Sequence, residues 1–239
     1  MKTVFHAAQS RGHFDYGWLR TYHSFSFSEY RNPERMHFGL LRVLNDDYVA
    51  GGTGFGLHPH DNMEIVTVML DGVLEHQDSM GNRRQLVPGE VQAMSAGSGL
   101  RHSEYNASAD EPLSLLQIWV YPQHRNTPPR YDQKAFDAEG RHNRWQYLVA
   151  SDGTEGALQI GQQAWFMRGQ FEGGSSATYR LHRPDHGLYV FVIDGQLTAN
   201  GHPLSRRDGL GLWETESVDF VFGGASDVLL IEVPLHQTA

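Results

Sequence analysis

The stretch from Leu57 to Gly72 has the sequence LHPHDNMEIVTVMLDG, which joins two histidines to a strand and a turn. Pro59 lacks a backbone N–H and favours extended geometry at His58. The run from residue 64 to residue 70 is rich in β-branched and apolar residues, as strands are, and the Asp-Gly pair after it is a strong turn signal. We therefore predict a strand that carries the histidines, then an apolar strand that ends in a tight turn.

A similar stretch occurs about half a chain later. Residues 181–195 have the sequence LHRPDHGLYVFVIDG, again with a histidine, a proline, an apolar run and an Asp-Gly turn. Both halves alternate short β-rich runs with glycine turns and show little helical periodicity. This pattern predicts an all-β chain with two antiparallel β-sandwiches or jelly rolls. Because strand-turn-strand sequences resemble one another easily, a chance resemblance between the halves is the alternative.

A proline-containing polar segment, residues 121–131, separates the two halves and indicates a connection. We therefore divide the chain into an N-terminal domain, residues 1–132, and a C-terminal domain, residues 133–239. Residues 133–140 have a composition that a short helix would accept. No segment is of low enough complexity to be assigned as disordered.

Two pairs of residues share the spacing i, i+2: His58 with His60, and His102 with Glu104. On a strand this spacing places both side chains on one face, because successive side chains alternate sides. Two such strands facing each other would bring three imidazoles and one carboxylate to one point. This set suits a divalent first-row metal, which takes about four to six ligands and would keep open positions for water or substrate. The alternative is that these are scattered surface residues, since the chain contains 14 histidines.

The second half lacks the same set of side chains. His182 is placed to match His58, but Pro184 stands where His60 does in the first half, and residues 213–218 contain no histidine. We therefore expect one metal ion, bound in the N-terminal half. The C-terminal half would then be a structural or lid-forming partner.

The composition excludes several classes of protein. The 239 residues are 39% hydrophobic, enough to fill a core, but no apolar run approaches the ~18 residues of a membrane-spanning helix, so we predict no membrane association. The N-terminus lacks the apolar stretch of a secretory signal, and a cytoplasmic location is expected. The absence of cysteine excludes disulfides and thiolate-ligated metals. A net charge of −9 with dispersed basic residues argues against direct nucleic-acid binding.

The spacing of glycines and histidines resembles the two cupin motifs. Residues 52–64, with the spacing G-x5-H-x-H-x3-E, are similar to the first motif, and residues 99–106, with G-x2-H-x3-N, are similar to the second. The sequence departs from the general pattern by one extra residue after the first motif's glutamate and by a glycine in place of the second motif's usual proline. Within the cupins it most closely resembles the pirin family, over most of residues 15–135. The stretches that carry this resemblance are Trp18, HSFSF at 23–27, LRVLNDD at 41–47, GFGLHPH at 54–60, EHQDSMG at 75–81, MSAGSGLRHSE at 94–104 and QIW at 117–119.

The pirin resemblance implies a bicupin, two cupin-type jelly-roll β-barrels with few short helices, and metal in the N-terminal barrel alone. The residues that match the metal ligands of pirins are His58, His60, His102 and Glu104. In many other cupins the carboxylate ligand is the glutamate of the first motif, here Glu64. Strand parity does not distinguish the two glutamates, because both lie an even number of residues from a histidine. We follow the pirin pattern, and Glu64 remains a candidate for orienting a ligand imidazole.

The resemblance also implies a cofactor and an activity. One divalent metal ion is expected, with iron as the first choice and nickel, cobalt, manganese or zinc as alternatives. Bacterial pirin-like proteins are assigned as quercetin 2,3-dioxygenases, which implies that a flavonol and O2 are the substrates and that ring opening releases carbon monoxide. The metal would lower the pKa of the flavonol hydroxyl, and Glu104 would be the base that takes its proton.

Five further residues are candidates for the surroundings of this site. His76 could line the pocket or donate a hydrogen bond to a ligand, but we prefer a structural role. Asp78 is expected to hydrogen-bond backbone amides of the turn that follows it. Phe55, Met63 and Trp119 are candidate walls for a flat aromatic substrate, although each is equally suited to an ordinary core.

Two other functions are compatible with the same metal set. Eukaryotic pirins resemble metal-dependent co-regulators of transcription factors, so a non-enzymatic, redox-sensing module that binds a protein partner is the main alternative. A sugar isomerase or another cupin enzyme would share the metal set but lack the pirin-type flanking sequences. We expect a monomer, because two fused barrels can cover each other's open faces.

Overall fold

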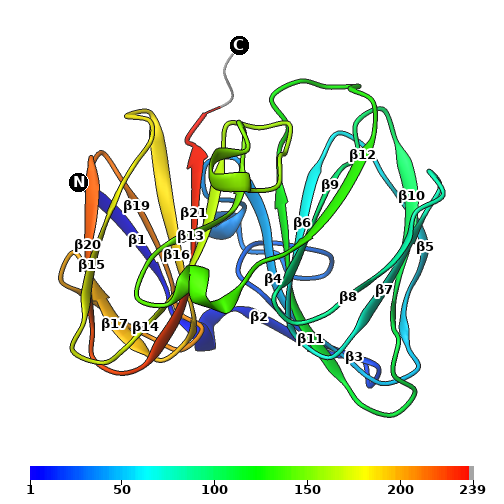
Figure 1. Ribbon diagram of the computed structural model, residues 1–239, viewed down its shortest axis with the longest axis horizontal. Helices are drawn as coiled ribbons and strands as arrows, with labels where there is room; N and C mark the ends of the chain where they lie inside the picture. Colours follow the sequence, from blue (N-terminus) through cyan, green and yellow to red (C-terminus); the bar gives the residue numbers. More distant parts are fainter. Residues whose placement is uncertain (237–239) are drawn as a thin grey trace.

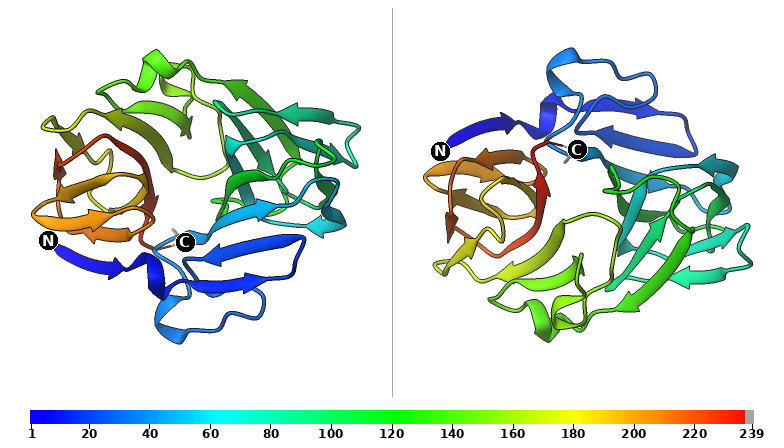
Figure 2. Two further views of the ribbon diagram at one scale, coloured as in Figure 1. Left: turned by 90° about the horizontal axis from the view of Figure 1, so that it is seen from below. Right: turned by 90° about the horizontal axis from the view of Figure 1, so that it is seen from above.

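The computed structural model describes residues 1–236, which form two β-barrels packed side by side (Figure 1). These residues contain 21 strands and four short 3-10 helices, and no α-helix occurs among them. The two further views in Figure 2 show that the first strand of the chain runs alongside the barrel that is made from the C-terminal half. The predicted all-β bicupin architecture is confirmed.

Two antiparallel sheets form the N-terminal barrel. The larger sheet has seven strands, in the order β12 (Arg130–Ala135), β9 (Glu90–Ser95), β6 (Glu64–Asp71), β11 (Leu113–Val120), β4 (Leu41–Val49), β3 (Leu19–His23) and β2 (Gly12–Asp15). The smaller sheet has four strands, in the order β5 (Gly54–His60), β10 (Leu100–Asn106), β7 (Leu74–Asp78) and β8 (Arg83–Leu86). The predicted apolar strand is β6, and Gly72 after it has φ +76°, as a glycine turn requires.

The C-terminal barrel repeats this plan with a six-stranded and a four-stranded sheet. The larger sheet has the order β1 (Lys2–His6), β19 (Gly209–Trp213), β16 (His186–Asp194), β21 (Ser226–Pro234), β14 (Trp165–Phe171) and β13 (Gln146–Ala150). The smaller sheet has the order β15 (Ser176–Arg180), β20 (Ser217–Phe222), β17 (Gln196–Ala199) and β18 (His202–Ser205). The second predicted apolar strand is β16, and Gly195 in the turn after it has φ +90°.

The 3-10 helices lie in connections between strands. They are η1 (Ala8–Ser10), η2 (Pro33–Arg35), η3 (Ala138–Arg141) and η4 (Thr154–Gly156). The expected helix over residues 133–140 is wrong for its first half, because that segment up to Ala135 belongs to β12 and pairs with β9. The helical turn begins only after Asp137, whose side chain accepts a hydrogen bond from the Glu139 amide.

Strand pairing crosses between the two halves of the chain at the N-terminus. β1 pairs antiparallel with β19, with Lys2 opposite Trp213 and His6 opposite Gly209. Residues 2–6 therefore lie in the second barrel, although the sequence placed them in the first. The division of the remaining chain after residue 132 stays a prediction.

The two barrels share one apolar core. Buried side chains from the outer face of the N-terminal seven-stranded sheet, such as Val66 and Ile118, belong to the same cluster as Tyr189, Phe191 and Ile231 of the C-terminal six-stranded sheet. Burial of such large apolar side chains is the main stabilising contribution to this contact. The two large sheets are therefore packed against each other, and the two small sheets face outward.

The interiors of the two barrels differ. The C-terminal barrel is filled by a continuous apolar cluster that includes Phe220, Phe222 and Met167. The N-terminal barrel holds two separate apolar clusters, one around Met69 and one around Met94. Buried polar residues of the same barrel are Thr21, Asn45, Asp47, Thr67, His76, Gln92, His102, Glu104 and Gln117. Because buried polar groups cost free energy unless they are paired, these side chains require hydrogen-bonding or other polar partners inside the N-terminal barrel.

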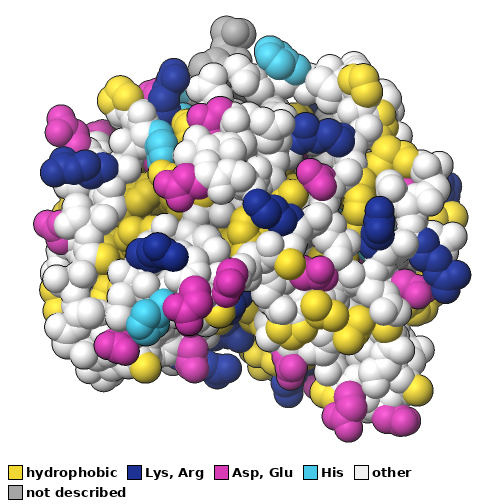
Figure 3. All heavy atoms as spheres, viewed as in Figure 1, with side chains coloured by type: hydrophobic (Ala, Val, Ile, Leu, Met, Phe, Trp, Pro, Cys, Tyr) yellow, Lys and Arg dark blue, Asp and Glu magenta, His cyan; other side chains and the backbone are white. Residues whose placement is uncertain are grey.

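On the face drawn in Figure 3, Lys and Arg side chains are scattered among Asp and Glu side chains. This distribution agrees with the dispersed charges of the sequence. Within residues 1–236, no helix has both the length and the apolar character needed to cross a membrane.

Candidate metal centre

Three histidines meet inside the N-terminal barrel, on two neighbouring strands. On β5 and β10, His58 pairs directly with His102, and His60 pairs with Leu100. Side chains of directly paired residues lie on the same face of a sheet, so all three imidazoles point into the barrel. One ring nitrogen from each of the three lies within 4.8 Å of the others. The ring centroids are 4.4 to 4.9 Å apart.

Glu104 follows on the same strand but belongs to a second group. The pairing of β10 with β5 shifts between His102 and Glu104, so that Glu104 stands opposite Phe55. Across β7, Glu104 pairs with His76, and these two residues form with His102 another set whose ligand atoms lie within 4.8 Å of one another. The structure thus places the four predicted ligands in two overlapping groups that share His102. Their joint binding of one metal stays a prediction.

The ring nitrogens of the three histidines fit a cation. His58 Nδ1 lies 2.7 Å from the carbonyl oxygen of Gly56, which makes Nδ1 the protonated nitrogen and leaves Nε2 as a free lone pair. His102 Nε2 is buried and has no hydrogen-bond partner among residues 1–236. A buried, unpaired acceptor is costly unless something binds it. The donor set therefore suits a divalent first-row metal ion.

The protonation state of these histidines also suits metal binding. Burial, with the neighbouring His58, lowers the pKa of His60 to about 4. Burial, with His58, His60 and His76 nearby, lowers the pKa of His102 to about 2. Both rings are therefore neutral at neutral pH, and neutral imidazole is the form that binds metals.

Glu104 lies in a buried polar environment beside the histidines. Burial raises the pKa of Glu104 to about 7, against the effect of a hydrogen bond from Gln117. The Gln117 amide nitrogen lies 3.2 Å from one carboxyl oxygen and 3.4 Å from the other. Gln117 is held in turn by Thr67, whose hydroxyl lies 3.2 Å from its amide oxygen. The Glu104 carboxyl group thus has a fixed position and, without a bound metal, a pKa near neutral pH.

A pocket of about 400 Å³ opens onto the three histidines and Glu104. The residues that line it besides these four are Trp18, Phe27, Asn45, Asp47, Gly54, Phe55, Gly56, Ile65, Gln117 and Trp119. Phe55 and Trp119 line this pocket, as the first of their two predicted alternatives states. Met63 does not line it and packs against the apolar cluster around Met94, which is the ordinary-core alternative.

Sequence reasoning missed part of the pocket wall. Trp18, Phe27 and Asp47 come from segments before and within β3 and β4, far from the histidines in sequence. Asp47 is buried, and burial raises its pKa to about 7 despite a 2.5 Å hydrogen bond from the Thr21 hydroxyl. The available signal was the pirin resemblance, because Trp18, Phe27 and Asp47 all lie in stretches that carry it.

Glu64 does not lie with the histidines. It begins β6, after a turn in which Asn62 has φ +47°, and its carboxylate accepts a 2.6 Å hydrogen bond from Ser95. A backbone hydrogen bond from Gly161, in the C-terminal half, reaches the same carboxylate. The candidate role of Glu64 in orienting a ligand imidazole is therefore wrong, because the turn separates it from the strand that carries His60.

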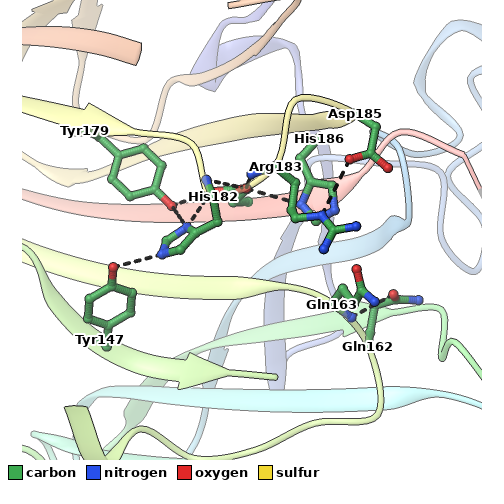
Figure 4. A network of polar contacts seen from close by, with 9 residues as sticks. Tyr147, Gln162, Gln163, Tyr179, His182, Arg183, Asp185 and His186 are labelled. Carbon is green, nitrogen blue, oxygen red and sulfur yellow. Dashed lines mark hydrogen bonds and ion pairs between the residues drawn. The ribbon is translucent and has the colours of Figure 1, made fainter. Parts of the chain in front are cut away.

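The C-terminal barrel contains a hydrogen-bonded network that includes the histidine aligned with His58 (Figure 4). His182 Nδ1 lies 2.9 Å from the buried carboxylate of Glu232, and its Nε2 lies 2.9 Å from the Tyr147 hydroxyl. The Tyr179 hydroxyl donates to the same carboxylate at 2.5 Å. Both ring nitrogens of His182 are thus engaged by the protein, which agrees with the expectation of a structural role for this half.

Replacing Glu232 with Gln is expected to lower the melting temperature by about 5–10 °C at pH 7. Burial alone would raise the pKa of Glu232, but hydrogen bonds from His182 and Tyr179 outweigh it and lower the pKa to about 2. A carboxyl whose pKa is lower in the folded state stabilises the fold above its unfolded pKa. This contribution, about 3 kcal/mol from the pKa difference, is lost as the pH falls through the folded value.

The difference in melting temperature between the wild type and Glu232→Gln should therefore shrink below about pH 5. Thermal unfolding followed by fluorescence at pH 7, 4 and 3 measures it. Glu214→Gln is the control, because Glu214 is an exposed glutamate of the same barrel that pairs with Lys2. A difference that stays constant across this range would contradict the role assigned to the Glu232 charge.

Comparison with known proteins identifies similar sequences in both halves of the chain. The family model Pirin matches residues 4–120, and the family model Quercetinase C-terminal cupin domain matches residues 147–233. A protein of Escherichia coli (strain K12) named quercetin 2,3-dioxygenase is 41% identical over 228 residues, which cover 95% of this chain and 96% of that protein. A pirin-like protein of Caulobacter vibrioides is 37% identical and covers 91% of this chain, with 94% of its own length matched.

Solved structures agree with the sequence comparison. The crystal structure of YhhW from Escherichia coli has a TM-score of 0.94 with this chain at 39% identity, and covers 99% of this chain and 100% of its own. The structure of bacterial pirin YhhW in complex with nickel(II) has a TM-score of 0.92 at 39% identity, with 98% and 99% covered. A relative with the same fold thus binds a divalent metal.

Proposed function

Because this chain belongs to the pirin family, we propose that it is a metal-dependent dioxygenase that cleaves flavonols such as quercetin with O2. The observation that carries the proposal is the pocket in which three histidines and a buried carboxyl group lie beside aromatic walls. Relatives at 41% identity that are named quercetin 2,3-dioxygenase support it.

The proposed metal ligands are His58, His60, His102 and Glu104. Nickel(II) in a relative shows that the fold accepts a divalent ion, and we propose iron as the first candidate here, with nickel, cobalt, manganese and zinc as alternatives. When bound, the metal would act as a Lewis acid that lowers the pKa of a flavonol hydroxyl.

Glu104 is proposed to take the proton from that hydroxyl. A general base works best when its pKa lies near the operating pH; burial raises the pKa of the Glu104 carboxyl, whereas a bound cation would lower it. The hydrogen bonds from Gln117 hold the carboxyl group in place for the transfer. The flavonolate then reacts with O2, and both oxygen atoms enter the ring-opened ester as one carbon leaves as carbon monoxide.

The walls of the pocket suit a flat, partly polar aromatic molecule. Trp18 and Phe55 are in edge contact, with centroids 5.2 Å apart, and Phe27 and Trp119 form a second edge contact at 5.3 Å. Apolar aromatic walls exclude water and bind planar rings. Asp47, between these walls, offers a polar group to a substrate hydroxyl.

Replacing Trp18 with Ala is expected to raise KM for quercetin by about 5–10-fold, because an aromatic contact contributes ~1 kcal/mol or somewhat more to binding. The value of kcat should change little, because Trp18 is proposed to supply apolar contact and takes no part in proton transfer. Steady-state kinetics of the metal-loaded protein measure both. Tyr16→Ala, an exposed aromatic nearby in the sequence, is the control. A fall in kcat with unchanged KM would contradict the role of Trp18 as a wall.

The decisive test of the proposed function is quercetin turnover by the protein loaded separately with iron, nickel, cobalt or manganese. Loss of the visible absorption band of quercetin, with matching uptake of O2, is the expected result for at least one metal. No turnover with any of these metals would overturn the proposal. That outcome would favour the alternative, a redox-sensing co-regulator that binds a protein partner.

A further inference from the structure

His76 connects the candidate metal centre to a turn at the edge of the small sheet. On β7, His76 and Asp78 stand opposite Glu104 and His102 of β10. His76 Nδ1 lies 3.5 Å from His102 Nδ1, and His76 Nε2 lies 3.3 Å from Asp78 Oδ2. His76 is fully buried, and Asp78 is nearly so. The contacts thus run from Asp78 through His76 to Nδ1 of His102. The other ring nitrogen of His102, Nε2, is the one left for a metal.

Asp78 is fixed by the turn that follows β7. Its Oδ1 accepts hydrogen bonds from the backbone amides of Met80 at 2.9 Å and Asn82 at 3.0 Å, as the sequence predicted. The side-chain amide of Asn82 donates to Oδ2 at 2.8 Å. All three of these groups donate to Asp78, which suits an ionised carboxylate, because that form only accepts hydrogen bonds.

This arrangement determines the position of each proton in these contacts. Since Asp78 Oδ2 is an acceptor, His76 Nε2 carries its proton and His76 Nδ1 has a free lone pair. His76 Nδ1 then accepts the proton on His102 Nδ1. His102 Nε2 is left as a lone pair, and this is the buried nitrogen that has no partner among residues 1–236.

We propose that Asp78 and His76 are positioning residues that lock His102 in the tautomer whose Nε2 binds the metal. Partners behind a metal-ligating histidine fix its tautomer and ring orientation, and their loss weakens metal binding by about 10–100-fold. His58 obtains the same control from the Gly56 carbonyl. The inference depends on the metal site of the proposed function, but not on its substrate.

The variant Asp78→Asn is expected to reverse the positions of the protons on His76 and His102 while the side chain keeps nearly the same shape. Its oxygen can keep the two backbone hydrogen bonds that Asp78 Oδ1 accepts, and the Asn82 side chain can turn its own oxygen toward the new NH2 group, which then faces His76 Nε2. His76 must then carry its proton on Nδ1, and His102 must carry its proton on Nε2, where the metal would bind. We expect the affinity for Co²⁺ to fall by about 10–100-fold, measured by calorimetry without any substrate.

A second measurement reports the tautomer itself. Correlation NMR of ¹⁵N-labelled imidazole rings in the metal-free protein should show His102 protonated on Nδ1 in the wild type and on Nε2 in Asp78→Asn. The matched control is Asp71→Asn, because Asp71 also accepts a backbone amide, that of Gly72, but is exposed and far from the histidines in the turn after β6. The control should keep both the affinity and the tautomer of the wild type.

A second pair of variants tests these contacts if Asp78→Asn does not fold. His76→Gln offers an oxygen to His102 Nδ1 and an amide to Asp78, so its Co²⁺ affinity should stay within about threefold of the wild type, whereas His76→Leu should lose about 10–100-fold. Equal affinities for these two variants would overturn the proposal. So would a wild-type protein with His102 protonated on Nε2, or a loss of affinity in Asp78→Asn without a change of tautomer.

These outcomes are separate from those of the proposed function. A wild-type protein that binds Co²⁺ and shows the expected tautomer, but does not turn over quercetin, would overturn the dioxygenase and leave the positioning role intact. Quercetin turnover together with the wrong tautomer would do the opposite.

Discussion

Replacing Glu104 with Gln is expected to lower kcat for quercetin cleavage by about 10²–10⁴-fold while most of the metal stays bound, because general-base catalysis contributes a factor of this size. Gln has nearly the shape of Glu and can still offer an oxygen, so three histidines and an amide remain at the site. It cannot take a proton, however, and the flavonol hydroxyl would have to lose its proton to water. Part of the lost activity should return at high pH, because the flavonol hydroxyl then loses its proton without a base from the protein.

The measurement is steady-state turnover alongside metal content by elemental analysis. Glu64→Gln is the control, because Glu64 is a buried carboxyl of the same barrel that bonds to Ser95 rather than to the site. Full turnover by Glu104→Gln would exclude the base role. Loss of both metal and turnover would instead make Glu104 mainly a ligand.

Replacing His60 with Ala is expected to remove metal and activity together. One ring nitrogen of His60 lies within 4.8 Å of a ring nitrogen of His58 and of His102. Loss of this ring leaves only His58 and His102 of the three histidines. Metal ions contribute several kcal/mol to reactions of this kind, which corresponds to about 10³-fold or more in rate. The ring also packs at 4.9 Å against Trp119, so the pocket wall loses a contact as well.

Metal content after dialysis and quercetin turnover should be measured on the same preparation. His37→Ala is the control, because His37 is exposed and its Nδ1 bonds only to the nearby Gly39 carbonyl. Stoichiometric metal in His60→Ala would show that the ligands have been assigned incorrectly.

The sequence predicted the strands of this protein well where local rules apply. The apolar runs before the Asp-Gly turns are β6 and β16, and the i, i+2 spacing correctly placed the imidazoles of His58 and His60 on one face. The side-chain role of Asp78 in its turn also followed from sequence, because a turn aspartate bonds to amides only a few residues away.

Other features depend on the path of the chain between elements. Counting residues could not separate Glu64 from Glu104, because the turn at Asn62 resets the alternation between β5 and β6. Trp18 and Asp47 reach the pocket through strand pairings that span long stretches of sequence. The role proposed for His76 rests on the distances between its two nitrogens and their neighbours, which the sequence does not give. These features depend on tertiary contacts, which the secondary-structure propensities of residues and the spacing of apolar residues do not encode.

The pairing of β1 with β19 has a consequence for how the chain matures. Residues 2–6 find their hydrogen-bonding partner only after residues 209–213 have been synthesised. Domains otherwise tend to fold in the order of their synthesis. Until then, β1 has no partner strand. Cutting the chain at its midpoint would leave one fragment with an unpaired β1 and the other with β19 as an exposed sheet edge. Neither piece can be complete without the other.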